Sequence, residues 1–246
     1  SCFFNLIFIN IVQPSTHAVS LSKNTPVIAN TYVASSAAVV GKVNIGAGSS
    51  VGYGSCIRGD VNSISIGSKV SIGDRVMIHC SGLAGNNPTK IGNQVVIGSG
   101  AIIHGAELED ESMVGAGAQV LDTAKVQKHA MVAPGALVGS GKIVKTGQLW
   151  GGIPAVYIRD LTDIEKASIS AQAEENATWA TVHAKEAAKG WEEIEEDLYN
   201  FEQEYGRADY YYKRLTPEQK SFKEGELENH SIPGRVFDSP ISHRTN

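Results

Sequence analysis

Aliphatic residues recur at every sixth position along much of this chain, and neither a helix nor an ordinary strand has that period. Hexapeptide repeats are typical of a parallel β-helix, in which each short strand buries one apolar side chain and three hexads close one coil. The repeat therefore predicts an all-β domain of about seven coils. The repeat residues are Val33, Val39, Ile45, Val51, Ile57, Ile66, Ile72, Ile78, Ile91, Ile97, Ile103, Val114, Val120, Val126, Val132, Val138, Val144 and Trp150.

The period slips at three places, which we interpret as insertions at corners. The step is nine residues from Ile57 to Ile66, thirteen from Ile78 to Ile91 and eleven from Ile103 to Val114. The second slip adds seven residues to a hexad, and its glycines, asparagines and proline predict an exposed loop. The Gly-x-Gly strings suit tight corners rather than a nucleotide-binding loop, because no helix follows any of them.

Two histidines directly follow repeat residues of neighbouring coils: His79 follows Ile78, and His104 follows Ile103. Removing the seven inserted residues from the 25 that separate the two isoleucines leaves 18, which is one complete coil. We therefore expect the two imidazoles to stack roughly 5 Å apart, where they could share one metal ion. A zinc site that also binds water needs a third protein ligand. Either the site is empty or a neighbouring chain completes it.

The residues around this pair resemble the γ-class carbonic anhydrases over about residues 25 to 165. With the helical extension that follows, the resemblance is greatest to the carbonic anhydrase subunits attached to mitochondrial respiratory complex I. It implies a left-handed β-helix that forms trimers, with zinc held at each interface by two histidines of one chain and one histidine of its neighbour. The matching motifs are Arg58-Gly59-Asp60, Ile72-Gly73-Asp74, Val76-Met77-Ile78-His79, Ile91-Gly92-Asn93, Ile97-Gly98-Ser99, Ile103-His104-Gly105 and Leu149-Trp150-Gly151-Gly152-Ile153-Pro154-Ala155, with Arg159 behind them.

The resemblance assigns His79 and His104 to the pair that one chain donates. The third-ligand position is Ser99, and a serine hydroxyl is a weak zinc ligand beside imidazole. A homotrimer should therefore bind zinc poorly. In a heterotrimer, zinc is expected only at an interface where a partner supplies the missing histidine, so this chain would contribute to at most one zinc site.

The resemblance also implies roles for charged residues at the subunit interface. Arg58, Asp60 and Asp74 match residues that fix the geometry of the trimer through pairs of arginine and carboxylate. Gly73, however, stands where the family has a glutamine beside the zinc. These departures favour a scaffold over an enzyme that is active alone, and no residue is assigned to catalysis with confidence.

We therefore interpret the chain as a structural or assembly subunit of the matrix-side trimer of complex I, peripheral to the mitochondrial inner membrane. Its expected partners are other γ-carbonic anhydrase-like subunits and membrane-arm subunits. Two alternatives remain: an active zinc carbonic anhydrase within a heterotrimer, and a hexapeptide acyltransferase, which shares the fold. A net charge of −5 without a basic stripe argues against nucleic-acid binding.

The sequence divides into four segments. Residues 1–26 contain an apolar stretch too short to span a bilayer as a helix, and residues 27–160 hold the β-helix. Residues 161–206 predict one helix that begins at the capping box Thr162-Asp163-Ile164-Glu165 and ends near Gly206, with Gly190 as a possible bend. Residues 207–246 form a tail with too few aliphatic residues for a core of its own.

An apolar seam along the predicted helix favours packing against the β-helix. Unbroken, the helix would be roughly 65 Å long, whereas seven coils measure roughly 35 Å, so part of it should overhang. The seam residues are Ala180, Ala184, Ala187, Trp191, Ile194, Leu198, Phe201 and Tyr205.

The three cysteines, Cys2, Cys56 and Cys80, form no zinc or redox motif.

Overall fold

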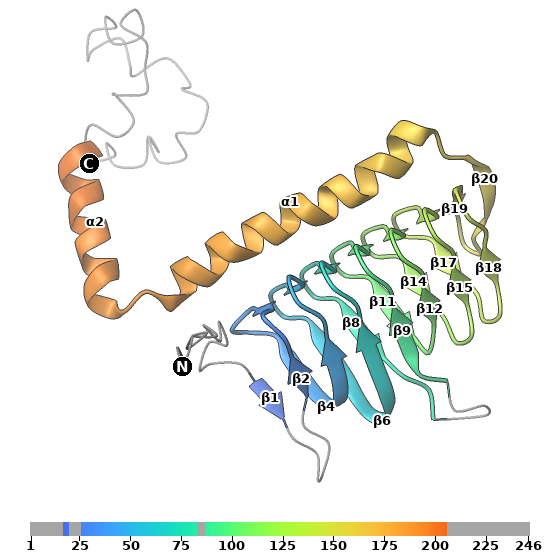
Figure 1. The fold of residues 1–246 in the computed structure, drawn as a ribbon, viewed down its shortest axis with the longest axis horizontal. Helices are drawn as coiled ribbons and strands as arrows, with labels where there is room; N and C mark the ends of the chain where they lie inside the picture. The colour runs from blue at the N-terminus through green and yellow to red at the C-terminus, as the bar shows by residue number, and fades with distance from the viewer. Residues whose placement is uncertain (1–16, 20–25, 83–86, 206–246) are drawn as a thin grey trace, which may run out of the picture. The chain divides into compact units, whose positions relative to one another are not determined.

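A computed structural model describes residues 17–19, 26–82 and 87–205. These residues form short strands β1 to β20 and two helices, and the chain divides into two compact units between Ala188 and Lys189. The first unit is a left-handed parallel β-helix with one helix along it (Figure 1), as the hexapeptide repeat and the family resemblance predict.

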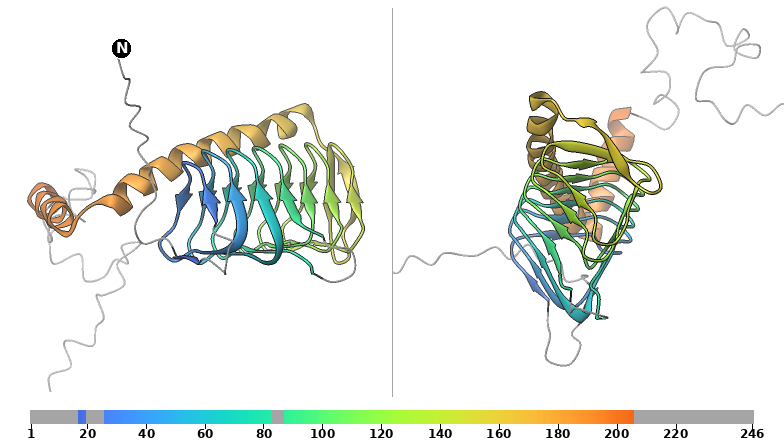
Figure 2. Two further views of the ribbon diagram at one scale, coloured as in Figure 1. Left: turned by 60° about the horizontal axis from the view of Figure 1, so that its bottom comes forward. Right: turned by 90° about the vertical axis from the view of Figure 1, so that its right-hand side faces the viewer.

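The β-helix is triangular in section (Figure 2, right), and we call its three faces A, B and C. Face A contains β1 (His17–Val19), the first parts of β4 (Ala38–Ile45) and β6 (Cys56–Ile66), β8 (Met77–His79), β11 (Ile102–His104), β14 (Gln119–Val120) and β17 (Leu137–Val138). Face B contains β2 (Val27–Ile28), the second parts of β4 and β6, β9 (Thr89–Ile91), β12 (Glu107–Leu108), β15 (Lys125–Val126) and β18 (Ile143–Val144). Face C contains β3 (Tyr32–Val33), β5 (Ser50–Val51), β7 (Ser71–Ile72), β10 (Val96–Ile97), β13 (Met113–Val114), β16 (Met131–Val132), β19 (Gln148–Gly151) and the antiparallel β20 (Val156–Asp160).

The repeat residues stack in parallel register and fill the interior of the β-helix. From Val33 to Val144 each is at most 4% exposed, and only Trp150, in the last coil, is partly exposed. Burying a valine or isoleucine side chain stabilises a fold by roughly 1.5–3 kcal/mol. The six-residue period therefore specifies the core and, with it, the register of every coil.

The third slip of the period is not an insertion, contrary to the sequence prediction. Leu108 is buried and pairs with Ile91 on one side and Val126 on the other. The eleven residues between Ile103 and Val114 therefore hold one hexad that is a residue short and one normal hexad. The prediction missed Leu108 because it counted six residues forward from Ile103, which falls on Glu109.

The capping box begins helix α1 (Asp163–Ala188). The Thr162 N–H donates to Glu165 Oε2 at 2.9 Å, and the Glu165 N–H donates to Thr162 Oγ1 at 3.3 Å. Arg159 holds the same carboxylate with two hydrogen bonds, of 2.8 and 2.7 Å. The Arg159 guanidinium, together with the Thr162 N–H, lowers the pKa of Glu165 to about 2. This cluster fixes the point where the chain leaves the β-helix.

Helix α1 covers face C (Figure 2) and contacts β3, β5, β7 and β10. Its buried residues are Ile169, Ala173, Ala180 and Ala184, and the Asn176 side chain donates to Ser71 Oγ at 3.0 Å. With 26 residues, α1 is about 39 Å long, close to the estimated length of the β-helix. Within the described residues of the first unit, faces A and B have no helix over them.

The predicted single helix is two helices, because α1 ends at Ala188 and α2 (Trp191–Tyr205) begins after Gly190. Glycine costs roughly 1 kcal/mol inside a helix relative to alanine, so the break falls where the sequence is weakest. Ala187 is exposed and does not belong to the buried stripe. In α2, Trp191, Ile194 and Leu198 are 71%, 38% and 58% exposed.

Several sequence predictions concern residues outside the described part of the chain. These are the apolar stretch within residues 1–16, the loop residues 83–86 and the tail 207–246. In the described part, neither helix combines the length and apolar character that crossing a bilayer requires.

Candidate metal centre

His79 and His104 lie side by side at the corner between faces A and B, as the spacing predicts. The two residues pair directly in the parallel ladder of β8 and β11. Their ring centroids are 5.2 Å apart, and His79 Nδ1 lies 3.2 Å from His104 Nε2. Two nitrogens bound to one tetrahedral zinc ion at 2.0–2.1 Å would be about 3.3 Å apart. The pair therefore already has the spacing that a shared zinc ion requires.

A carboxylate lies against the far nitrogen of each ring. Asp60 Oδ1 is 2.9 Å from His79 Nε2, and Asp122 Oδ1 is 2.8 Å from His104 Nδ1. Histidines that bind metals commonly donate their other ring N–H to a carboxylate, which sets the tautomer and the ring orientation. Asp122 was missed in the sequence; it follows His104 by 18 residues, one more than the 17 that separate the paired residues Ile103 and Val120.

Asp60 also pairs with Arg58, which donates to Asp60 Oδ2 at 2.7 Å. Partial burial acts to raise the pKa of Asp60, but hydrogen bonds from His79 and Arg58 outweigh it and lower that pKa to about 2. The carboxylate is therefore ionised at neutral pH and anchors one end of the histidine pair.

The series Asp60, His79, His104, Asp122 contains three short contacts, but two neutral imidazoles carry only two N–H protons. One contact must then bring two lone pairs together unless a cation, either a third proton or a metal ion, occupies it. If both carboxylates accept a hydrogen bond from a ring N–H, the contact that needs a cation is the one between His79 Nδ1 and His104 Nε2. The chemistry of this donor set fits a zinc ion shared by the two histidines.

Ser99 lies at the other end of face A, at the corner that joins faces C and A. Five residues of largely extended chain, at about 3.3 Å each, place it roughly 16 Å from His104. A single chain therefore cannot bring Ser99 and the histidine pair to the same ion. The Ser99 hydroxyl instead accepts a hydrogen bond of 3.2 Å from the Asp74 N–H.

Gly73 packs directly beneath Ser99. A Cβ atom at position 73 would lie 2.7 Å from the Ser99 backbone nitrogen and 3.0 Å from the Ile97 carbonyl oxygen. Such contacts with backbone atoms cannot be relieved by rotating a side chain, so a glutamine at this position requires the neighbouring coil to move. The two departures from the family pattern thus occur at one corner and in contact with each other.

The charged residues predicted at the interface divide between the two corners. Arg58 and Asp60 lie beside the histidine pair, whereas Asp74 lies beside Ser99, where its Oδ1 accepts a 2.7 Å hydrogen bond from the Tyr53 N–H. Within one chain, Arg58 pairs with Asp60 and not with Asp74. Their role between subunits stays a prediction.

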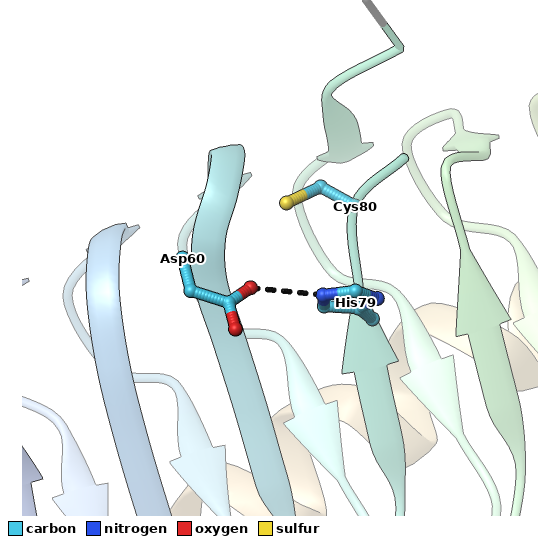
Figure 3. A group of neighbouring side chains, drawn as sticks. All are labelled: Asp60, His79 and Cys80. Atoms are coloured by element: carbon cyan, nitrogen blue, oxygen red, sulfur yellow. Dashed lines mark hydrogen bonds and ion pairs between the residues drawn. The ribbon is translucent and has the colours of Figure 1, made fainter. Parts of the chain in front are cut away.

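Cys80 lies next to this centre, although the sequence shows no cysteine motif. Ligand atoms of Asp60, His79 and Cys80 all lie within 4.8 Å of one another (Figure 3). The Cys80 thiol is buried, and it accepts a 3.1 Å hydrogen bond from the Asn62 N–H. Burial raises its pKa. The sequence could have indicated Cys80 as a residue of this centre, since it directly follows His79.

The outward residues of the three faces differ in character. Face C is covered by α1, and face B carries Lys90, Glu107 and Lys125 in adjacent coils. Face A instead presents an apolar row, in which Met77 and Ile102 are each 37% exposed. In coil order, the face A row is Cys56, Met77, Ile102, Gln119 and Leu137. The histidine pair stands at the edge of this uncovered apolar face.

Comparison with known proteins agrees with this architecture, although no protein-family model matches the chain. Over 187 residues the chain is 43% identical to the protein named gamma carbonic anhydrase 2, mitochondrial, of Arabidopsis thaliana, covering 75% of this chain and 67% of that protein. It is 45% identical to gamma carbonic anhydrase 1, mitochondrial, of the same plant, over 67% of this chain and 61% of that protein. It is 41% identical to the probable carbonic anhydrase of Methanocaldococcus jannaschii, over 58% of this chain and 89% of that protein.

Solved structures show the same fold. A hexapeptide transferase family protein of Anaplasma phagocytophilum is 34% identical and matches with a TM-score of 0.62, over 66% of this chain and 95% of that one. A putative acetyltransferase of Bacillus cereus is 26% identical with a TM-score of 0.65, over 68% and 95%. Fold and histidine pair together define a hexapeptide β-helix protein with a candidate metal centre. The identity to the three carbonic anhydrases is more specific, and the chain belongs to the γ carbonic anhydrase family.

Proposed function

We propose that this chain is a structural and assembly subunit of the matrix-side γ-carbonic anhydrase trimer of mitochondrial complex I, and that it donates His79 and His104 to one interface zinc site. The observation that carries the proposal is the contrast between an intact histidine pair at one corner and Ser99 at the other. A subunit of this kind can complete a site with one neighbour but cannot complete the site of the other.

Zinc, when bound, supplies a Lewis acid that activates water for attack on carbon dioxide. The residues of this chain provide two of its ligands, and Asp60 and Asp122 orient them. The third ligand has to come from a neighbour that keeps its histidine. Coexpression with such a relative should give zinc at one interface per mixed pair, and the chain alone should leave the position between His79 and His104 without zinc. Stoichiometric zinc there in a homotrimer would contradict the proposal.

The apolar row of face A is the surface that we propose for trimer contacts, because it is uncovered and borders the histidine pair. Ile102→Lys on face A should therefore weaken the oligomer, as measured by light scattering over a dilution series. Ile143→Lys is the matched control, since Ile143 occupies the same hexad position on the charged face B and is 49% exposed. If both variants keep the wild-type mass, face A is not the interface.

Attachment to the mitochondrial inner membrane, on its matrix side, is proposed from two sources. The Arabidopsis relatives are named mitochondrial, and the resemblance described above is greatest to complex I subunits. We expect residues 1–26 and 207–246 to make contacts outside the trimer with membrane-arm subunits. Deleting residues 1–20, or everything after Gly206, should release a folded trimer from complex I on native gels. A truncated chain that still migrates with the complex would contradict this role.

Two enzymatic functions are the alternatives. An active carbonic anhydrase would hydrate carbon dioxide rapidly in a zinc-loaded heterotrimer, and loss of that rate with His104→Ala in this chain would place the activity at its interface. A hexapeptide acyltransferase is suggested by the Anaplasma and Bacillus structures. Saturable binding of acetyl-coenzyme A to the isolated chain, measured by calorimetry, would favour it.

A further inference from the structure

A second set of metal ligands lies within a single chain, on the side of His79 that faces away from His104. Asp60 comes from β6, His79 from the end of β8, and Cys80 directly follows it (Figure 3). Their carboxylate, imidazole and thiol ligand atoms are within 4.8 Å of one another. Around one zinc ion such atoms would be about 3.3–3.6 Å apart, so the side chains need to close by only about 1 Å.

We propose that Asp60 Oδ1, His79 Nε2 and Cys80 Sγ form a binding site for a thiophilic divalent cation such as Zn²⁺, separate from the interface site and independent of any partner chain. The donor set contains one oxygen, one nitrogen and one sulfur, which is a set that zinc accepts. Three protein ligands leave the fourth position of a tetrahedral ion for water.

The arrangement of hydrogen bonds suits this site. Arg58 holds Asp60 Oδ2, and Asp60 Oδ1 accepts a 3.0 Å hydrogen bond from the Val61 N–H. The carboxylate is thus held in place while Oδ1 exchanges its contact with His79 for a metal ion. A metal on His79 Nε2 places the single ring proton on Nδ1, where it can be donated to His104 Nε2 at 3.2 Å. His104 in turn donates to Asp122. Every ring nitrogen then has a partner, with no facing lone pairs.

Access and charge also suit a cation. The side chains of Asp60 and His79 are 24% and 21% exposed, whereas Cys80 lies fully buried behind them. A cation can therefore enter from solvent through the two exposed ligands and meet the thiol last. On binding, the thiol proton passes to solvent, and the thiolate and the carboxylate together balance the two positive charges of the ion.

This site and the interface site use opposite nitrogens of His79, and they differ in what they require. The interface site needs a histidine from a neighbour, whereas the Cys80 site needs only this chain. In a homotrimer, where Ser99 offers no third ligand, the Cys80 site is the one that we expect to hold metal.

The test is cobalt binding to the full-length chain expressed alone and kept reduced. Co²⁺ replaces zinc, and sulfur ligation produces an intense thiolate-to-cobalt absorption band in the near ultraviolet. We expect this band in the wild type and in the matched controls Cys56→Ser and Cys2→Ser. Cys80→Ser should abolish the band. His104→Gln should retain it, because a glutamine oxygen can still accept the His79 Nδ1 proton and His104 is not a ligand.

The proposal is overturned if cobalt binds to the wild type without the band, or if the band survives Cys80→Ser. It is also overturned if His104→Gln abolishes cobalt binding as fully as His79→Gln does, since the pair would then be the site. Because a buried Cys80→Ser change could perturb folding, Asp60→Asn provides a second reading at the surface. This variant should keep the band, because Cys80 is unchanged. It should weaken the affinity for cobalt by at least the roughly 10- to 100-fold that is typical when a residue hydrogen-bonded to a metal ligand is lost. Unchanged affinity would count against the site.

Discussion

The A–B corner and the C–A corner of the same β-helix differ in how they hold their polar residues. At the A–B corner, backbone pairing sets His79 beside His104, and Asp60 and Asp122 fix both rings. At the C–A corner, the Ser99 hydroxyl accepts a hydrogen bond from the Asp74 N–H, and Ser99 packs over Gly73. The first corner holds the proposed ligand pair with its supporting carboxylates, whereas the second has a serine at the proposed position of the third ligand.

The difference follows from what each residue contributes to folding. The histidine pair belongs to a hydrogen-bonded series that spans four coils, so removing one member leaves polar atoms without partners. In the proposed assembly, a third ligand at position 99 would belong to the neighbour's site, and a serine there satisfies the corner of its own chain. Under that proposal, the third ligand can be replaced without cost to the fold that carries it, and a paired ligand cannot.

The largest effect that we expect is loss of interface zinc from His104→Ala. In a mixed assembly with a histidine-bearing relative, the change removes one of three protein ligands and leaves the Asp122 carboxylate unpaired. In a Cys80→Ser background, so that the count reports the interface alone, zinc per mixed pair measured by elemental analysis after dialysis should fall from about one to near zero. His129→Asn is the control, because His129 lies in a later coil at φ +55°, a conformation that asparagine tolerates. Equal loss of zinc in both variants would show that the A–B corner does not hold the zinc ion.

Restoring the third ligand with Ser99→His should have the next largest effect. In a homotrimer of this chain, it supplies the missing imidazole to the neighbour's histidine pair, so zinc should rise toward one ion per interface. We would measure this in a Cys80→Ser background, so that the count reports the interface alone. Carbon dioxide hydration should rise less than zinc content, because position 73 is still a glycine and not the glutamine of the family. If zinc content does not change, Ser99 is not at the third-ligand position.

Gly73→Gln tests the other departure at the C–A corner. Its Cβ atom would meet the Ser99 backbone nitrogen at 2.7 Å, so the substitution should lower the free energy of unfolding by roughly 1–3 kcal/mol in urea titrations. Gly139→Gln is the matched control, since a Cβ atom there meets no atom within 4 Å. Equal stability of the two variants would show that the corner relaxes freely.

The sequence predicted the architecture because the buried residue of each hexad determines both the register of the coils and the core of the β-helix. His79 and His104 could be placed by counting because stacking in a β-helix follows the coil length of 18 residues. Leu108 was missed because a one-residue deletion resembles an insertion when only strict phase is counted. The helix break at Gly190 was considered only as a bend, since the apolar spacing continues through it.

The supporting residues of the site were harder to predict. Asp122 lies one residue past the position that continues the pairing of Ile103 with Val120, so a strict count of stacked positions does not place it beside His104, and a carboxylate in a corner is ordinary on its own. Cys80 and Asp60 meet because β6 carries three additional residues between Ile57 and Ile66, and the path of such an insertion does not follow from the period. Whether the third ligand comes from a neighbour depends on an assembly that one sequence describes only by resemblance.

The smallest effect that we expect is a pH dependence of stability carried by Asp60. Its pKa is lowered from 3.8 to about 2 in the folded chain, so its contribution is fully present above about pH 4 and is lost as pH falls through about 2. Solvent screening at this partly exposed carboxylate limits the contribution to about 1 kcal/mol. In chelator-treated protein, Asp60→Asn should therefore be less stable than wild type at pH 6, and the difference should shrink between pH 4 and pH 2. Asp163→Asn, at a fully exposed carboxylate, controls for a general loss of negative charge. A difference that stays constant over this range would show that Asp60 supports the A–B corner through its shape and not through its charge.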